Sequence, residues 1–191
     1  MDKQSQLEQI TADIQRKNVC PDLAESAHSL VMGDGSLDAD IVFIGEAPGK
    51  KEDLTGLPFV GASGKFLDTM LASIHLQRKD VYITNIVKYR PPNNRDPSVA
   101  EKAAFWPYLL RQIEIIQPKV IITLGRHSMA NFLPGVKIGD IHGQLRHVHI
   151  DELDLAVVPL FHPAAALYNG GLRQTLTDDF LKVPGLIKQV S

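Results

Sequence analysis

The chain has 191 residues, of which 44% are hydrophobic; this length allows one well-buried core and is short for two, so we expect a single domain over residues 1–191. Its formal charge of −2, from 20 Lys and Arg against 22 Asp and Glu, excludes a generally basic protein and makes any surface for a polyanion a local one. One cysteine, Cys20, excludes a disulfide framework, and the lack of an apolar leader or membrane-spanning run predicts a soluble, cytoplasmic protein without membrane contact.

Apolar runs and helical periodicity alternate along the chain. In chain order the patterns predict a helix at 3–18, a strand at 41–45, a helix at 62–75, a strand at 81–84, a helix at 98–117, a strand at 120–124, a helix at 126–132, an edge hairpin at 136–150, a strand at 156–161 and a helix at 174–189 that breaks near Pro184. The strands are nearly continuous apolar runs, which is typical of strands covered on both faces. Because strands alternate with helices, the sequence predicts an α/β fold, a three-layer α/β/α sandwich with a central, mostly parallel four-stranded sheet.

Polar side chains follow each of the four predicted strands. In a parallel sheet the ligand crevice lies beyond the carboxyl ends of the strands, so these residues can be considered as one set. They are Glu46 after Gly45, then Asn85, then Arg126 after Gly125, and His162. A carboxylate, an amide, a cation and an imidazole from distant parts of the chain therefore converge on one edge of the sheet.

Glu46 and a further candidate, Phe59, belong to glycine-rich and proline-rich loops. Glu46 begins the turn Glu46-Ala47-Pro48-Gly49, where its carboxylate can orient water or stabilise a developing cation, or can simply cap the next segment. Phe59 lies in the loop Gly56 to Gly61, where an aromatic ring can stack on a planar base or can simply fill the core. Each motif alone leaves both interpretations open.

The amide of Asn85 has a donor and an acceptor, which suits the edge of a nucleobase, although Asn after a strand is also an ordinary turn former. Pro163 restricts the backbone of His162 and holds its ring at the strand end. A neutral imidazole there can donate to an oxygen that gains negative charge, or can serve only as a structural histidine.

Basic residues gather around the same edge, although the chain as a whole is slightly acidic. They are Lys50, Lys51, Lys65, Lys88, Arg90, Arg95, Arg126 and His127. This clustering favours a surface that faces phosphates, and an ordinary solvated face is the alternative.

Two further motifs carry no site. Gly64-Lys65 resembles the end of a phosphate-binding loop, but Phe66 stands where Ser or Thr is needed, so a nucleoside triphosphate site is rejected. His147 and His149 alternate on a predicted strand, but no carboxylate or cysteine spacing completes a metal site around them. The sequence predicts no metal site.

Taken together, these motifs resemble the uracil-DNA glycosylases of the family 4 type. The matching segments are Gly45 to Gly49 with Glu52-Asp53, Gly56 to Gly61 with Gly64, Val81 to Lys88 with Arg90-Pro91-Pro92, Asn94 to Pro97, Gln117 to Ile121, and His162-Pro163-Ala164. They run in family order over residues 31–170. The resemblance implies a single-domain DNA repair enzyme that flips uracil out of DNA and hydrolyses its bond to deoxyribose, leaving an abasic site.

By motif position, the resemblance implies roles for the catalytic pair. Glu46 is similar to the residue that places the water, and His162 to the one that stabilises the uracil O2. This agrees with the chemistry, because breaking an N-glycosidic bond builds positive charge on the sugar and negative charge on the base. An anion near the first and a hydrogen-bond donor near the second lower the barrier.

The resemblance also implies a uracil pocket. The backbone at Ala47 would line it, Phe59 would stack on the flipped base, and Asn85 would read the edge of the base. Glu52 stands where the family excludes the methyl group of thymine.

For DNA binding, the basic edge contributes Lys88, Arg90 and Arg126, and the resemblance implies that a loop from Ala164 to Asn169 enters the duplex with Leu167 as its wedge. The expected partner is uracil-containing DNA, single-stranded as well as double-stranded, and the expected state is a monomer. Single strands should be good substrates, because extrusion of the base costs least there.

One departure from the family is large, because its members usually hold a 4Fe-4S cluster on four cysteines. The third and fourth of these positions are Tyr89 and Phe105 here, and Cys20 is the one thiol left. We therefore expect no cluster and no other cofactor, with the aromatic rings filling the vacated volume. Two alternatives stay open, a glycosylase for another deaminated base such as hypoxanthine or xanthine, and a module that binds uracil or DNA without cleavage.

Overall fold

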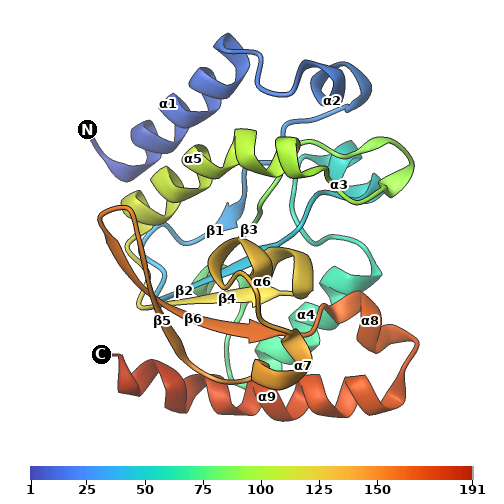
Figure 1. Cartoon of the computed structure of the whole chain (residues 1–191), viewed down its shortest axis with the longest axis vertical. Coiled ribbons are helices and arrows are strands. Elements are labelled where there is room, and N and C mark those ends of the chain that lie inside the picture. The colour runs from blue at the N-terminus through green and yellow to red at the C-terminus, as the bar shows by residue number, and fades with distance from the viewer. Residues whose placement is uncertain (191) are drawn as a thin grey trace.

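The structure is a computed structural model that describes residues 1–190. Its middle layer is a six-stranded sheet in the order β1-β3-β2-β4-β6-β5 (Figure 1). The strands are β1 (Asp34–Gly35), β2 (Ile41–Gly45), β3 (Tyr82–Asn85), β4 (Val120–Leu124), β5 (Arg146–Ile150) and β6 (Leu153–Leu160). The four inner strands β3, β2, β4 and β6 run parallel, which confirms the predicted α/β sheet. The predicted count of four strands was wrong, because β1 and β5 add antiparallel edges.

Helices cover both faces of this sheet. One face carries α1 (Lys3–Arg16), α5 (Val99–Ile116) and α6 (Arg126–Phe132), and the other carries α4 (Ala62–Ser73) and α9 (Gly170–Gln189) (Figure 1). On the α9 face the rings of Phe43 and Phe180 stack at a centroid distance of 5.8 Å. On the α1 face Ile10 and Ile14 are fully buried with Phe105. The predicted three-layer sandwich is therefore confirmed, with a core on each side of the sheet.

Sequence prediction placed the long helices well and missed the short ones. The short helices are α2 (Pro21–Ser26), α3 (Lys50–Thr55), α7 (Ile138–Ile141), α8 (Pro163–Leu167) and the 3-10 turns at Arg78–Asp80 and Pro92–Asn94. Elements of three to six residues are too short to show a helical period. The predicted hairpin at 136–150 was also wrong, since α7 occupies its first half and β5 instead pairs with β6.

The C-terminal helix begins earlier than predicted and does not break. Asn169 caps its first turn by accepting a hydrogen bond from the Leu172 amide at 3.1 Å, and the helix runs on through Pro184. None of the helices within residues 1–190 has the length and apolar character needed to cross a membrane.

The strand order determines where a ligand crevice can lie at the edge of the sheet. The chain goes from β2 to β3 on one side of β2 and then crosses to β4 on its other side, so the connecting helices α4 and α5 cover opposite faces of the sheet. At such a switch point the loops separate beyond the carboxyl ends of the strands and leave room for a ligand. Ser128 of α6 secures this end, because its hydroxyl donates to the carbonyl of Ile44 at 2.6 Å.

Candidate active site

A cavity of about 350 Å³ opens at the carboxyl edge of the sheet, next to this switch point. Its lining includes seven of the residues predicted from the sequence, which are Glu46, Ala47, Glu52, Phe59, Asn85, His162 and Ala164. Segments more than 100 residues apart in the chain thus meet around one space large enough for a nucleobase.

The geometry around His162 fixes its protonation and its tautomer. Nδ1 accepts a hydrogen bond from the backbone amide of Ala164 at 3.0 Å, so the proton of the neutral ring is on Nε2. Burial lowers the pKa of His162 to about 4, because protein surrounds most of the ring and disfavours its cation. At neutral pH the side chain is therefore a neutral donor fixed at the cavity.

Glu46 follows β2 directly and is half-buried. Its Oε1 is shielded from solvent and has no hydrogen-bond partner among the described residues. Burial raises the pKa of Glu46, and the neighbouring side chains of His127, Lys102 and Arg126 oppose this shift. An oxygen without a protein partner at the edge of a cavity is placed to accept from a water molecule or to face a cation.

Asn85 and Phe59 approach each other across the bare backbone of Gly45. A Cβ at Gly45 would lie 2.4 Å from Oδ1 of Asn85 and 2.6 Å from Cζ of Phe59, so only glycine leaves room for both side chains. The Phe59 ring in turn lies 5.7 Å from the His162 ring, with 29° between their planes. Amide, aromatic ring and imidazole are thereby packed together on one side of the cavity.

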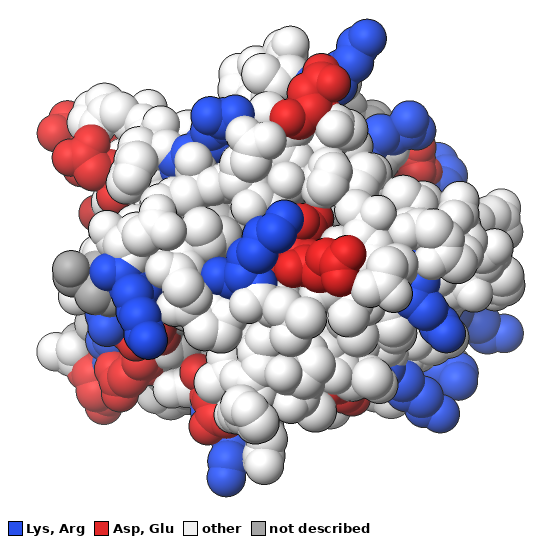
Figure 2. All heavy atoms as spheres, turned by 90° about the horizontal axis from the view of Figure 1, so that it is seen from below, with Lys and Arg blue, Asp and Glu red and all other residues white. Residues whose placement is uncertain are grey.

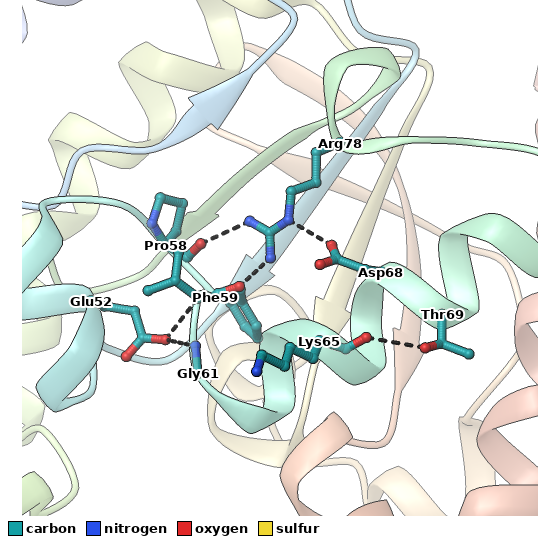
Figure 3. Close-up of polar contacts among 9 residues, drawn as sticks. Glu52, Pro58, Phe59, Gly61, Lys65, Asp68, Thr69 and Arg78 are labelled. Atoms are coloured by element: carbon teal, nitrogen blue, oxygen red, sulfur yellow. Dashed lines mark hydrogen bonds and ion pairs between the residues drawn. The ribbon is translucent and has the colours of Figure 1, made fainter.

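The loop that carries Phe59 is held in a strained conformation. Phe59 has a φ of +52°, in the left-handed region, which costs a bulky residue about 1–3 kcal/mol. Figure 3 shows Arg78 reaching the loop from one side, where it donates to the carbonyls of Pro58 and Phe59 and pairs with Asp68 at 2.6 Å. These contacts offset the strain and fix the ring.

Glu52 supports the same loop from the other side (Figure 3). Its Oε1 accepts from the amides of Val60 and Gly61, each at 2.9 Å. Glu52 lines the cavity as predicted, but the contacts given by the structure make it a support for the Phe59 loop. The exclusion of thymine by Glu52 stays a prediction.

Replacing Gly64 by alanine is expected to disrupt the Phe59 loop. A Cβ at this third residue of α4 would lie 1.6 Å from the carbonyl oxygen of Phe59, so the helix or the loop must move. We expect destabilisation by at least the ~1–3 kcal/mol typical of overpacking, together with weaker base binding. The measurements are thermal unfolding and single-turnover cleavage of an oligonucleotide that contains uracil.

Gly185→Ala in α9 is the matched control, because a Cβ there meets nothing within 4 Å and alanine stabilises helix interiors by up to ~1 kcal/mol over glycine. Equal unfolding midpoints for the two variants would contradict the assigned contact at Gly64.

Comparison with known proteins supports this site. The model of the uracil DNA glycosylase superfamily matches residues 32–183, which is most of the chain and includes the cavity residues named above. This chain belongs to the uracil DNA glycosylase superfamily. The family resemblance read from the motifs is thereby confirmed.

Curated relatives are similar over nearly the whole chain. A Type-4 uracil-DNA glycosylase of Saccharolobus solfataricus is 50% identical over 159 residues, which cover 80% of this chain and 74% of the relative. The Type-4 uracil-DNA glycosylase of Archaeoglobus fulgidus is 45% identical, covering 93% of this chain and 91% of the relative. That of Thermotoga maritima is 41% identical, covering 96% and 95%.

The prediction that Lys88 contacts DNA was wrong. Its side chain is fully buried, and its Nζ donates to Oγ1 of Thr84 at 2.6 Å and to the carbonyl of Asn85 at 2.7 Å. Burial lowers the pKa of Lys88 well below its usual value. Lys88 therefore cannot contact phosphates here and instead supports the end of β3, which carries Asn85.

The other predicted DNA contacts lie at or near the surface but are not equally available. Arg126 is exposed next to Glu46 in a second hollow, whereas Arg90 is partly buried and donates to Asn94 at 2.7 Å. On the face below α9, positive and negative side chains are interspersed (Figure 2). Phosphate binding by Arg126 and Arg90 stays a prediction.

The segment predicted as a DNA-entering loop is partly helical. Residues 163–167 form α8, so the prediction of a loop over Ala164 to Asn169 was wrong for its first four residues. Leu167 packs partly against the core, while Tyr168 beside it is 93% exposed. The sequence analysis did not single out Tyr168. The exposure of its side chain depends on the turn between α8 and α9, which residue type does not reveal.

The cluster that is usual in the family does not fit the residues of this chain. Cys20 is its single thiol, and Tyr89 and Phe105 are both buried and pack edge to face with centroids 5.9 Å apart. Burial raises the pKa of Tyr89, and the nearby Cys20 adds to this shift. These three side chains share one packed region, in which one thiol and two rings cannot supply four thiolates.

Sequence analysis also missed a group of ionisable residues at the mouth of the cavity. Glu46, Asp96 and His127 come from three separate segments, and their ligand-type atoms lie within 4.8 Å of one another. The two close approaches of His127 use different ring nitrogens, Nε2 toward Asp96 and Nδ1 toward Glu46, and the two nitrogens of one ring cannot both bind the same ion. The distances from His127 to Asp96 and Glu46, 3.4 and 3.9 Å, are those of ion pairs, which is how we interpret the group.

Proposed function

We propose that this chain, as a uracil-DNA glycosylase, uses Glu46 and His162 on opposite parts of one N-glycosidic bond. The observation that supports this most strongly is His162, whose neutral ring presents Nε2–H to a cavity bordered by Glu46, Phe59 and Asn85. A cavity with a fixed neutral donor, a stacking ring and a carboxylate suits cleavage of a base from its sugar.

In the proposed reaction the bond between N1 of uracil and C1′ of deoxyribose breaks. Its electron pair goes to the base, and the Nε2–H of His162 donates to the O2 oxygen where negative charge develops. Glu46 faces the positive charge that develops on the sugar and orients the water that attacks C1′. The water leaves its hydroxyl on C1′ and its proton goes to solvent or to the departing uracil, so the products are uracil and an abasic site.

Base recognition is assigned to Phe59 and Asn85. The ring of Phe59 offers a face for stacking, and the amide of Asn85 offers one donor and one acceptor to the edge of a base. Because their positions depend on Gly45, Arg78 and Glu52, the pocket is organised before DNA arrives.

Oligonucleotides that differ in one base test this function. Uracil, hypoxanthine, xanthine or thymine is placed at the same position, single-stranded and opposite a purine or pyrimidine partner, and alkali-labile sites are counted. We expect rapid cleavage at uracil and none at thymine. Faster cleavage at hypoxanthine or xanthine would favour the other-base glycosylase, and binding without any cleavage would favour a recognition module.

We further propose that the enzyme acts as a monomer on single-stranded as well as double-stranded DNA, and works without an iron-sulfur cluster. The packing of Tyr89 against Phe105 supports the absence of a cluster, because the two rings fill this region with hydrophobic side chains. Metal analysis of the purified protein together with sedimentation tests these statements.

Replacing Arg126 by alanine is expected to weaken DNA binding and to lower its salt dependence. Arg126 is exposed beside Glu46, so we assign it one phosphate contact. The slope of log K against log salt should fall by about 0.7 for a single strand, with little effect of sequence. The measurement is fluorescence anisotropy of a labelled oligonucleotide over a range of salt.

Lys79→Ala is the control, since it removes the same charge from the turn before β3, at the opposite edge of the sheet. An equal loss of slope in both variants would show general attraction and contradict a contact at Arg126.

A further inference from the structure

His127 lies between two carboxylates at the mouth of the cavity. It is the second residue of α6, which follows β4 directly. Its Nδ1 is 3.9 Å from Oε1 of Glu46, and its Nε2 is 3.4 Å from Oδ2 of Asp96. The two nitrogens of one ring thus face two different acids, one at the end of β2 and one in the segment before α5.

Glu46 depends on this neighbour. Its Oε1 is buried without a hydrogen-bond partner among the described residues, and a buried charge without a partner is costly. Burial favours the protonated acid and raises its pKa, and Asp96 acts in the same direction. His127 is the largest opposing influence, followed by Lys102 and Arg126.

We propose that His127 is a positioning residue for the glycosylase reaction, because its ring orients the Glu46 carboxylate and keeps it ionised while Asp96 holds the ring in place. This inference rests on the proposed role of Glu46. The two ring nitrogens lie 3.9 Å from Oε1 of Glu46 and 3.4 Å from Oδ2 of Asp96, so the ring occupies the space beside Oε1 and lies between the two acids.

Arg126 offers His127 a competing arrangement. Its Nε lies 3.4 Å from Nε2 of His127, the same distance as Asp96. A nitrogen that accepts from Arg126 cannot also donate to Asp96, so the two arrangements exclude each other.

Replacing His127 by glutamine or alanine tests the proposal. Single-turnover release of uracil is followed from pH 5 to 9 in the presence of EDTA, with enzyme in excess over a single-stranded oligonucleotide. We expect the acidic limb of the rate to move up by about one pH unit, because loss of an opposite charge at this distance raises a carboxyl pKa by that order. The rate at neutral pH should fall several-fold, while the enzyme concentration at half-maximal rate should not change.

Three comparisons keep the result decisive. His127→Lys retains a positive charge and should restore the acidic limb, and His147→Ala on exposed β5 should leave the whole profile unchanged. Unfolding midpoints show whether the variants are folded, and glutamine retains the polar character if alanine does not fold. If wild type cleaves and the glutamine variant keeps its pH profile, His127 has no such role. If wild type does not cleave uracil at all, the proposed function fails first.

Discussion

Replacing His162 by alanine is expected to slow uracil release by about 100-fold to 1,000-fold, the usual loss for one preorganised donor at a developing oxyanion. The reason is that Nε2–H is the donor left once Nδ1 accepts from Ala164. The measurement is the single-turnover rate at saturating enzyme, so that weaker DNA binding does not enter the result.

His142→Ala is the matched control, because His142 is a second partly buried histidine whose Nδ1 pairs with Asp179 at 2.6 Å and which does not line the cavity. It should leave the single-turnover rate unchanged. A similar loss in both variants would mean that general disturbance, and not the donor at His162, explains the effect.

Replacing Glu46 by glutamine is expected to lower the single-turnover rate by about 100-fold to 10,000-fold, the range for loss of a positioned acid or base. Glutamine keeps the size of the side chain but removes its charge. The pH profile adds a second readout, because burial raises the pKa of Glu46 and activity needs its ionised form. The rate of wild type should therefore fall as the pH drops through this raised pKa, and the acidic limb should vanish in the variant.

His162 does not set this limb, since its pKa of about 4 leaves it neutral throughout the range from pH 5 to 8. Glu152→Gln, at the exposed turn between β5 and β6, is the control. An unchanged acidic limb in the Glu46 variant would contradict the role of Glu46 as the titrating group.

Much of the site could be predicted from the sequence because the carboxyl ends of parallel strands lie at the same edge of a sheet. Apolar runs locate the strands, and the residues after them, Glu46, Asn85 and His162, must then lie on one edge. Phe59 was singled out from its glycine-flanked loop and the role of Glu52 entered through the resemblance to the family; the structure places both residues at the cavity.

Side-chain burial and pairing were not readable in the same way. Lys88 is of a residue type that often binds phosphate, but after the end of β3 its side chain points into the core. There its Nζ donates hydrogen bonds to Thr84 and to the carbonyl of Asn85. The contact of His127 with Asp96 joins segments 31 residues apart, and no local pattern marks such a pair. The edge strand β1 was missed because two residues carry no period.

The most direct test of the account compares uracil with 5-fluorouracil as the leaving base in single-turnover cleavage by wild type, His162→Ala and Glu46→Gln. Fluorine stabilises the departing anion, so it replaces part of what a donor at O2 supplies. We predict that His162→Ala loses much less rate on 5-fluorouracil than on uracil, while Glu46→Gln loses the same factor on both. Equal losses of His162→Ala on the two bases would contradict the claim that His162 stabilises the charge on the leaving base.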